Sequence, residues 1–250
     1  MKKPKKCKTT STKKPIPTED TSPNIPQRSK VKTTLKISHR ELNEKQNDFL
    51  KLAFNKETKL VFITGPAGTS KTFISILAAL KMLNERRVSD LIYIRSAVEC
   101  SENGLGFLPG EVNDKLAPYI QPLTDKMAEF LPKGDIDMLI KEERVSATPI
   151  GFLRGLNWNA KVIIADEAQN MSYKELFTLI TRIGEFSKVF ILGDPDQSDI
   201  NGKSGFSKMI AQFNDEESRQ NGIQVVEFTE DDIVRSGLVQ FIIKKVKKSA

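Results

Sequence analysis

Lys71 and Thr72 stand at the end of a glycine-containing loop whose residue types suit phosphate binding. The loop separates an apolar run at 60–64 from a helix-like apolar pattern at 73–80. In this strand–loop–helix context, backbone N–H groups and the helix N-terminus attract anionic phosphate. Lys71 would reach the β- and γ-phosphates of ATP, and the Thr72 hydroxyl would ligate Mg²⁺. The expected nucleotide-binding loop consists of Gly65, Pro66, Ala67, Gly68, Thr69, Ser70, Lys71 and Thr72.

Ser70 departs from the pattern of such loops, G-x-x-x-x-G-K-[ST], because it stands where the second glycine is expected. If the backbone needs a positive φ there, serine costs on the order of 1 kcal/mol more than glycine. The departure bears on loop geometry and on ATP affinity, but it leaves the Lys–Thr pair intact. An ordinary strand–turn–helix connection with a chance lysine is the alternative interpretation.

Two later apolar runs also end in polar side chains. The run at 161–165 leads into Asp166 and Glu167, and the run at 189–192 leads into a polar turn that contains Gln197. Continuous apolar runs are typical of central parallel strands, and ligands bind at the carboxyl ends of such strands. Asp166 is therefore expected to hold Mg²⁺ through its water shell, and Glu167 to polarise the attacking water as general base.

The chemistry-bearing segments need a sheet to bring them together. The alternation of strand-like and helix-like patterns predicts an α/β domain with a mainly parallel sheet flanked by helices. Prolines at 118 and 122 are expected to break the helix over 111–130, and Ser172 to cap the helix that follows the acidic pair. Strands are expected at 59–64, 90–95, 161–166, 188–193 and 223–228, and helices at 41–55, 71–84, 111–130, 172–183, 205–213 and 231–247.

These residues carry a family resemblance. The loop at 65–72, D-E-A-Q-N at 166–170 and G-D-P-D-Q at 193–197 resemble the motifs of PhoH-family ATPases, which are relatives of superfamily 1 helicases. The similarity covers roughly residues 40 to 245, and its compact form is similar to phage-encoded members, which would place it in the host-cell cytoplasm. Ser96 stands where the family has proline. Further similar segments are 96–99, 105–110, 118–123, 154–155 and 232–235.

The resemblance implies a single RecA-like P-loop NTPase domain, in which strand 188–193 lies between strands 59–64 and 161–166. It implies that Gln197 senses the γ-phosphate, with a turn-capping residue as the alternative. Gln46 could read the adenine edge as in the Q-motif of helicases, or be a surface glutamine on a helix. Arg235 is the leading arginine finger, with a surface salt bridge as the alternative. Arg95 and Arg154 are further candidates for that role.

The positive charge of the chain is concentrated in its first 36 residues. Residues 1–36 carry ten Lys and one Arg against two acidic residues, a net charge of +9, so that residues 37–250 sum to −2. This Pro-, Ser- and Thr-rich tail is expected to be disordered, with the ATPase domain at 37–250. The tail could bind nucleic acid by counterion release, or simply aid solubility.

Other classes of protein are disfavoured. No apolar run approaches the roughly 18 residues of a membrane helix, and no secretory signal is evident, so a cytoplasmic location is expected. Cys7 and Cys100 are too few for a disulfide framework, and the single histidine, His39, excludes histidine-based triads.

The sequence as a whole predicts Mg²⁺-dependent ATP hydrolysis, with Lys71, Glu167, Gln197 and Arg235 as catalytic residues. The partner is expected to be RNA or another single-stranded nucleic acid. Because a single RecA-like domain lacks the second domain that completes a helicase site, a ring, such as a hexamer, or another homo-oligomer is expected. The alternatives are a nucleotide-dependent nucleic-acid-binding protein with little hydrolysis, or a small-molecule kinase.

Overall fold

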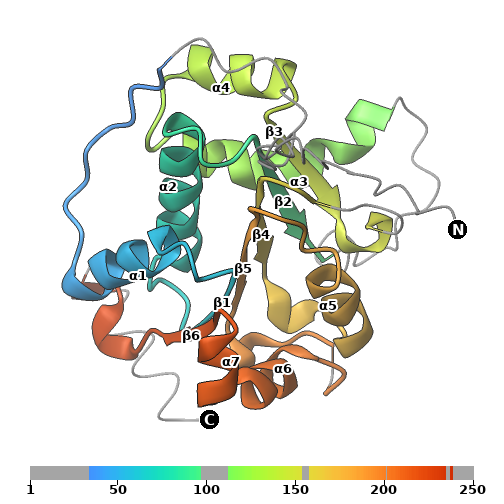
Figure 1. The fold of residues 1–250 in the computed structure, drawn as a ribbon. Helices are drawn as coiled ribbons and strands as arrows, with labels where there is room; N and C mark the ends of the chain where they lie inside the picture. Colours follow the sequence, from blue (N-terminus) through green and yellow to red (C-terminus); the bar gives the residue numbers. More distant parts are fainter. Residues whose placement is uncertain (1–33, 97–111, 154–157, 201, 235–236, 239–250) are drawn as a thin grey trace, which may run out of the picture.

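The computed structural model describes residues 34–96, 112–153, 158–200, 202–234 and 237–238 (Figure 1). Its centre is a six-stranded sheet in the order β3-β2-β4-β5-β1-β6, and each neighbouring pair runs parallel. The expected placement of 188–193 between the strand of the loop and the acidic strand is confirmed. The strands are β1 (Leu60–Thr64), β2 (Asp90–Arg95), β3 (Val145–Pro149), β4 (Lys161–Asp166), β5 (Lys188–Gly193) and β6 (Ile223–Glu227).

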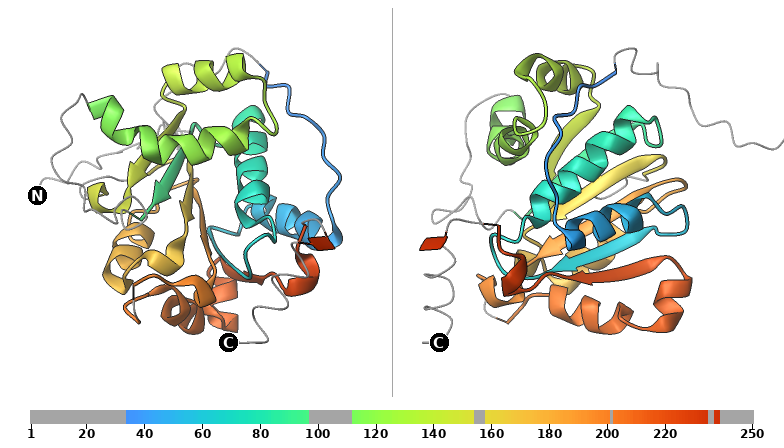
Figure 2. Two further views of the ribbon diagram at one scale, coloured as in Figure 1. Left: turned by 180° about the vertical axis from the view of Figure 1, so that it is seen from behind. Right: turned by 90° about the vertical axis from the view of Figure 1, so that its left-hand side faces the viewer.

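The central strands are apolar on both faces because helices cover both faces, as Figure 2 shows. On one face, Val61 and Ile63 pack with side chains from α1 (Glu44–Phe54), α2 (Lys71–Asn84), α3 (Val112–Met127) and α4 (Lys133–Lys141). On the other face, Leu60 and Phe62 pack with α5 (Tyr173–Ile180) and α6 (Phe206–Phe213). A short helix, α7 (Glu216–Gln220), precedes β6. The parallel α/β fold predicted from the alternating pattern is therefore observed.

Two predicted helices differ from the observed ones. The first begins at Glu44 rather than at 41, because Asn43 caps it and exchanges hydrogen bonds with Gln46. The second, α3, continues through Pro118 and Pro122, where a break was expected. Two prolines four residues apart remove hydrogen bonds on one side of the helix only. The helix is held against the sheet by buried side chains one turn apart, namely Tyr119, Leu123 and Met127.

The segment expected to begin the last helix is a turn instead. Residues Glu230–Asp232 form a 3₁₀ helix, η5, and Ile233 is extended. Asp232 caps this turn by accepting hydrogen bonds from Thr229 and a salt bridge from Lys45, 3.2 Å away on α1. The next backbone N–H, that of Val234, donates to the carbonyl of Gly68 at 3.0 Å. The prediction of a helix from 231 is therefore wrong for these residues, because the N–H groups of Asp232 and Ile233 bond within the 3₁₀ turn and that of Val234 bonds to the loop.

The N-terminal part of the described chain runs along the domain before α1. Leu35 is buried in the core, and its N–H donates to the side chain of Asn84 at 2.8 Å. Ser38 N–H donates to the carbonyl of Phe130, so this segment, blue in Figure 1, passes from α4 down to α1. The packed domain thus reaches back to Leu35, slightly before the expected boundary at 37. None of the helices in the described part of the chain is long and apolar enough to span a bilayer.

Gly205 brings the start of α6 against the start of α5. A Cβ on Gly205 would lie 2.3 Å from both the Cα and the N atom of Tyr173, whereas one on Gly134 of α4 would meet nothing within 4 Å. We expect Gly205→Ala to lower the free energy of unfolding by about 1–3 kcal/mol, because backbone atoms must move apart. The matched change Gly134→Ala should instead stabilise by about 0.5–1 kcal/mol. Equal effects in urea unfolding would contradict this close approach.

Candidate nucleotide-binding site

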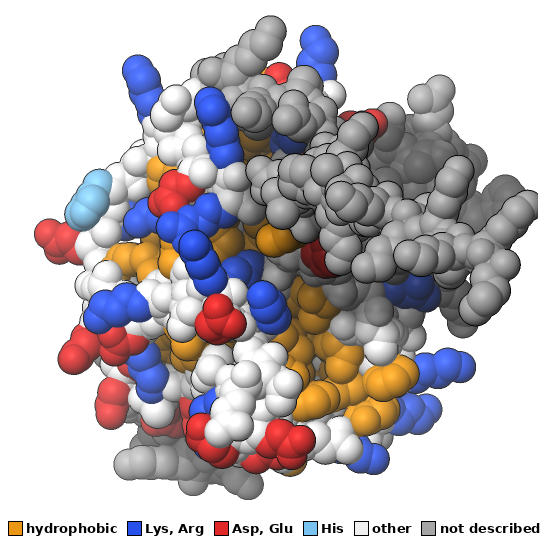
Figure 3. All heavy atoms as spheres, viewed as in Figure 1, with side chains coloured by type: hydrophobic (Ala, Val, Ile, Leu, Met, Phe, Trp, Pro, Cys, Tyr) orange, Lys and Arg blue, Asp and Glu red, His pale blue; other side chains and the backbone are white. Residues whose placement is uncertain are grey.

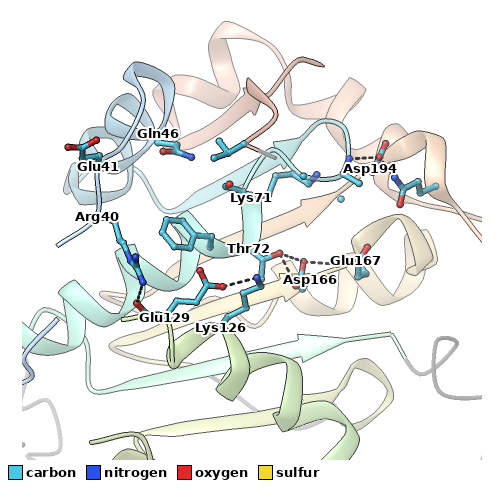
Figure 4. A pocket seen from close by; sticks show the side chains of 17 residues that line it. Arg40, Glu41, Gln46, Lys71, Thr72, Lys126, Glu129, Asp166, Glu167 and Asp194 are labelled. Carbon is cyan, nitrogen blue, oxygen red and sulfur yellow. Dashed lines mark hydrogen bonds and ion pairs between the residues drawn. The ribbon is translucent and has the colours of Figure 1, made fainter. Parts of the chain in front are cut away.

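The carboxyl ends of β1, β4 and β5 open into one cavity of about 570 Å³ (Figure 4). This volume lies in the range of small-molecule sites. Residues from the phosphate-binding loop, from the acidic pair and from the turn after β5 line it together, although they are far apart in sequence. The lining residues are Arg40, Glu41, Gln46, Ala67, Gly68, Ser70, Lys71, Thr72, Phe73, Lys126, Glu129, Asp166, Glu167, Gly193, Asp194, Gln197 and Val234.

The loop between β1 and α2 depends on backbone conformations that favour glycine. Gly65 has φ 145°, and a Cβ there would lie 2.3 Å from the carbonyl oxygen of Phe228. Gly68 has φ 85°. Ser70 is also left-handed, with φ 66° and ψ 24°, although it is not glycine. The missing second glycine therefore falls at a position that needs a positive φ, at a cost of about 1 kcal/mol.

Lys71 folds back over the loop at the first turn of α2. Its ammonium group donates to the carbonyl oxygens of Gly65 at 2.7 Å and Pro66 at 2.9 Å. Thr69 stiffens the same turn, because its hydroxyl donates to the Pro66 carbonyl at 2.8 Å. A phosphate group entering the loop would offer this ammonium a charged acceptor in place of neutral carbonyls.

Asp166 lies at the end of β4 with its carboxylate almost fully buried. Three donors from three elements surround it. The Thr72 hydroxyl lies 3.1 Å from each carboxylate oxygen, the Tyr93 hydroxyl donates at 2.5 Å, and the Glu167 N–H donates at 3.1 Å. Thr72 and Asp166 are thus adjacent hard oxygen ligands, which is the donor set that Mg²⁺ prefers. The residues present fit this ion.

Tyr93, in the middle of β2, is a further contact of the site, and no sequence motif singled it out. In the register of β2 and β4, Tyr93 lies opposite Ile164 and Arg95 lies opposite Asp166. Because side chains two residues apart on a strand point to the same face, Tyr93 and Asp166 share one face of the sheet. Burial, followed by the charge of Asp166, raises the pKa of the Tyr93 hydroxyl well above its ordinary value. Tyr93 therefore remains a neutral donor that orients Asp166.

Glu167 directly follows Asp166 and has a left-handed backbone with φ 55°. A left-handed conformation is strained for a residue other than glycine, and such strain is common at functional sites. Gln169 donates to one Glu167 carboxylate oxygen at 2.6 Å, and Arg95 lies 3.9 Å from the other. The candidate general base is thus held by an amide and by a cation.

Asp194 joins the turn after β5 to the phosphate-binding loop. Its buried carboxylate accepts hydrogen bonds from the Ala67 N–H at 3.1 Å and from the Gln197 amide at 2.8 Å. Its own N–H donates to Gln169 Oε1 at 3.1 Å. Because Gln169 also holds Glu167, a continuous chain of hydrogen bonds links the acidic pair, the turn after β5 and the loop.

The opposite end of the cavity is formed by α1, the segment before it and the end of α3. Gln46 is buried there, and its Oε1 accepts the Asn43 N–H. Arg40 donates to the backbone carbonyl of Glu129 at 3.0 Å, and the Glu129 carboxylate pairs with Lys126 at 2.9 Å. Sequence reasoning missed Arg40 and Glu129, since no local pattern signals a contact between segments so far apart in the chain.

The structure brings most of the predicted site residues together. The phosphate-binding loop, Asp166, Glu167, Gln197 and Gln46 share the cavity, and Gln46 is buried rather than on the surface. Arg235, Arg154, Cys7 and Cys100 lie outside the described residues, and so does most of the segment at 96–110. His39 is exposed.

A parallel sheet with a phosphate-binding loop after β1, and with the acidic strand β4 separated from β1 by β5 alone, defines a P-loop NTPase fold. Within this class, the family model of PhoH-like proteins matches residues 38–247, and the chain belongs to that family. It is 34% identical over 197 residues to a PhoH-like protein of Bacillus subtilis, covering 79% of this chain and 61% of the relative. It is 34% identical over 202 residues to Protein PhoH of Escherichia coli, covering 79% and 55%.

The chain therefore spans little more than half the length of these relatives. Among solved structures, it is similar to Bacteroides sp Pif1 in complex with ADP-AlF4, with 19% identity, a TM-score of 0.38, and coverage of 82% of this chain and 45% of the other.

We expect Tyr93→Phe to weaken Mg²⁺ use, because Asp166 loses the hydroxyl that orients it. Loss of such an outer contact typically costs 10–100-fold in metal affinity, roughly, so the Mg²⁺ concentration for half-maximal ATP hydrolysis should rise by about that factor. Tyr119→Phe is the matched control, since Tyr119 is equally buried but lies on α3 outside this contact. A titration of Mg²⁺ that gives the same midpoint for both variants would refute the role of Tyr93.

Proposed function

We propose that this chain binds and hydrolyses ATP with Mg²⁺ and couples hydrolysis to RNA or another single-stranded nucleic acid. One observation carries the proposal: Lys71 and Thr72 of the loop line the same cavity as Asp166, Glu167 and Gln197. A cation, an Mg²⁺ ligand pair, a general base and an amide are the groups that phosphoryl transfer to water needs.

Binding of the triphosphate would begin at the loop. The loop N–H groups and Lys71 would hold the phosphates, and Thr72 and Asp166 would hold Mg²⁺, which would supply neutralising positive charge at the phosphates. At present Asp194 accepts the Ala67 N–H. An incoming phosphate competes for this donor and repels the Asp194 carboxylate, and Gln197 then loses its acceptor. The Gln197 amide becomes available to the γ-phosphate only when the loop is filled.

Hydrolysis would depend on Glu167. Its carboxylate accepts the proton of the attacking water, while Gln169 holds the side chain by a 2.6 Å hydrogen bond. Arg95 lies 3.9 Å from the other Glu167 carboxylate oxygen.

The base of the nucleotide would lie against Gln46. Its amide oxygen is occupied by the Asn43 N–H, which leaves its N–H groups as the donors for an acceptor on the adenine edge. Arg40 and Glu129 close the same end of the cavity.

Coupling to nucleic acid is supported by the charge distribution, since the first 36 residues carry +9 on a domain of net charge −2. A nucleotide-dependent nucleic-acid binder with little hydrolysis is the alternative. The left-handed backbone of Ser70 favours it, because strain in the loop lowers affinity for the phosphates.

Glu167→Gln tests hydrolysis directly, because the amide keeps the shape of the side chain but cannot take a proton. We expect ATP to bind while turnover falls by roughly 10²–10⁴-fold. Lys71→Ala is the companion variant, and it should lose both turnover and ATP affinity. Phosphate release is measured with and without RNA, and with kinase acceptors. Near wild-type turnover in Glu167→Gln would assign the base to another residue, and acceptor phosphorylation would indicate a kinase.

Arg235 is proposed as an arginine finger that a neighbouring subunit delivers, in a ring such as a hexamer or in another homo-oligomer. Within the described domain, Lys71 is placed to hold the phosphates of bound ATP. Arg40 is the one arginine that lines the described cavity, and it lies at the end where the adenine base is expected. The alternative is that Arg235 acts in the site of its own chain. The neighbouring residue, Val234, supports this alternative, because its N–H donates to the carbonyl of Gly68 in the phosphate-binding loop of the same chain.

A mixing experiment separates the two arrangements of Arg235. An arginine supplied in trans is worth about 10³–10⁵ in rate, so Arg235→Ala alone and Lys71→Ala alone should both be almost inactive. Mixed, they should regain part of the activity, because an intact loop of one subunit meets an intact arginine of the other. No recovery, together with turnover per subunit that is independent of protein concentration, would place Arg235 in the site of its own chain or outside it.

A further inference from the structure

The helices α5 and α6 present exposed aromatic rings beside lysines. Phe177 is 53% exposed and Tyr173 36% exposed, one helical turn apart on α5. Lys174 lies on the same helix, and Lys208 on α6 places its ammonium 5.0 Å from the centre of the Tyr173 ring. Figure 3 shows hydrophobic side chains beside Lys and Arg over this part of the molecule. We call these four residues the α5–α6 surface.

The positive charge of this surface is unopposed by the acid on its own helix. Glu175 is turned away to cap α5, where it accepts hydrogen bonds from the N–H of Ser172 at 2.8 Å and from its hydroxyl at 2.7 Å. Tyr173 is fixed as well, because its hydroxyl donates to Gln212 of α6 at 3.0 Å. A fixed Tyr173 ring and an exposed Phe177 ring, with ammonium groups beside them, thus stand on a domain whose net charge is −2.

We propose that the α5–α6 surface binds single-stranded nucleic acid. A base stacks on the exposed ring of Phe177, and the ammonium groups of Lys174 and Lys208 contact the adjacent phosphates. Aromatic faces accept any base, and lysines next to them track the backbone, which is the chemistry of sequence-independent single-strand binding. The inference rests on the proposed function and gives its nucleic acid a place on the domain, separate from the basic tail.

The surface is joined to the catalytic segments by hydrogen bonds. Gly205, at the start of α6, donates to the carbonyl of Met171, which directly precedes the cap of α5. Asn170 and Asp199 exchange two hydrogen bonds, at 2.9 and 2.8 Å, between the turn after β4 and the turn after β5. The Ser198 hydroxyl donates to the Gln169 carbonyl at 3.1 Å. A ligand that shifts α5 therefore moves the turns that carry Glu167 and Gln197.

The experiment uses the full chain and two fluorescent probes, an oligouridine and an oligothymidine, which separate RNA from DNA. We expect Phe177→Ala to bind about tenfold more weakly, with an unchanged salt slope and unchanged basal ATP hydrolysis, and to lose stimulation by the oligonucleotide. Phe177→Tyr should keep the affinity and Phe177→Leu should lose it, since only the former retains a ring. Lys208→Ala should lower the salt slope by about one.

Phe186→Ala is the matched control, because Phe186 is also 53% exposed but lies in the turn before β5. It should bind both probes like the wild type. Equal affinity of Phe177→Ala and wild type would overturn the assignment of this surface and leave the proposed function standing. Failure of the wild type to bind either probe would overturn this assignment and the proposed coupling to nucleic acid, whereas ATP hydrolysis is tested separately with Glu167→Gln. A change in sedimentation of Phe177→Ala, with unchanged probe affinity, would overturn it in favour of a contact between copies of the chain.

Discussion

The buried carboxylate of Asp166 is the constraint on which the geometry of this site depends. An ionised carboxylate removed from water is costly unless donors surround it, and here they come from Thr72 on α2, Tyr93 on β2 and the N–H of Glu167. The start of α2, the register of β2 against β4 and the turn after β4 must therefore all be correct at once. The position of the Asp166 carboxylate, the proposed Mg²⁺ ligand, is therefore fixed by three separate segments of the chain.

A second carboxylate, Asp194, gives the site a different property. It bonds to the loop through Ala67 and to the turn after β5 through Gln197, so it occupies a donor that a phosphate would claim. Because two anions cannot share that donor cheaply, the proposed binding of nucleotide would be coupled to release of Asp194. Phosphate in the loop would therefore affect Gln197 in the turn after β5 through electrostatic repulsion of Asp194, without a large movement of the chain.

Much of the site could be predicted from the sequence because its parts are local motifs at strand ends. The loop at 65–72, Asp166–Glu167 and Gln197 each follow an apolar run, and the parallel sheet brings such ends together. The order of β4, β5 and β1 needed the family resemblance, since alternation of strands and helices allows several orders. The left-handed backbone at Ser70 was expected conditionally, from the glycine that it replaces.

The rest depended on contacts between distant segments. Pairing of Arg40 with the Glu129 carbonyl joins segments 89 positions apart, and no local pattern encodes it. The ring of Tyr93 packs in the core, and the sequence shows no more than that. Only the register of β2 against β4 reveals that its hydroxyl reaches Asp166. The continuous α3 shows the same limit, because packing of Tyr119 and Leu123 outweighs the local effect of two prolines.

The two turns that follow β4 and β5 carry candidate catalytic residues and also connect the sheet to α5 and α6. They carry Glu167 and Gln197, yet they are bonded to each other through Asn170 and Asp199 and lead directly into α5 and α6. A turn that is cross-bonded in this way cannot adjust to a γ-phosphate without moving its neighbour. The close approach at Gly205 then passes the movement to the helices, since backbone in van der Waals contact transmits displacement rather than absorbing it. The proposed hydrolysis at one edge of the sheet would therefore be transmitted to the α5 side of the domain through these short links.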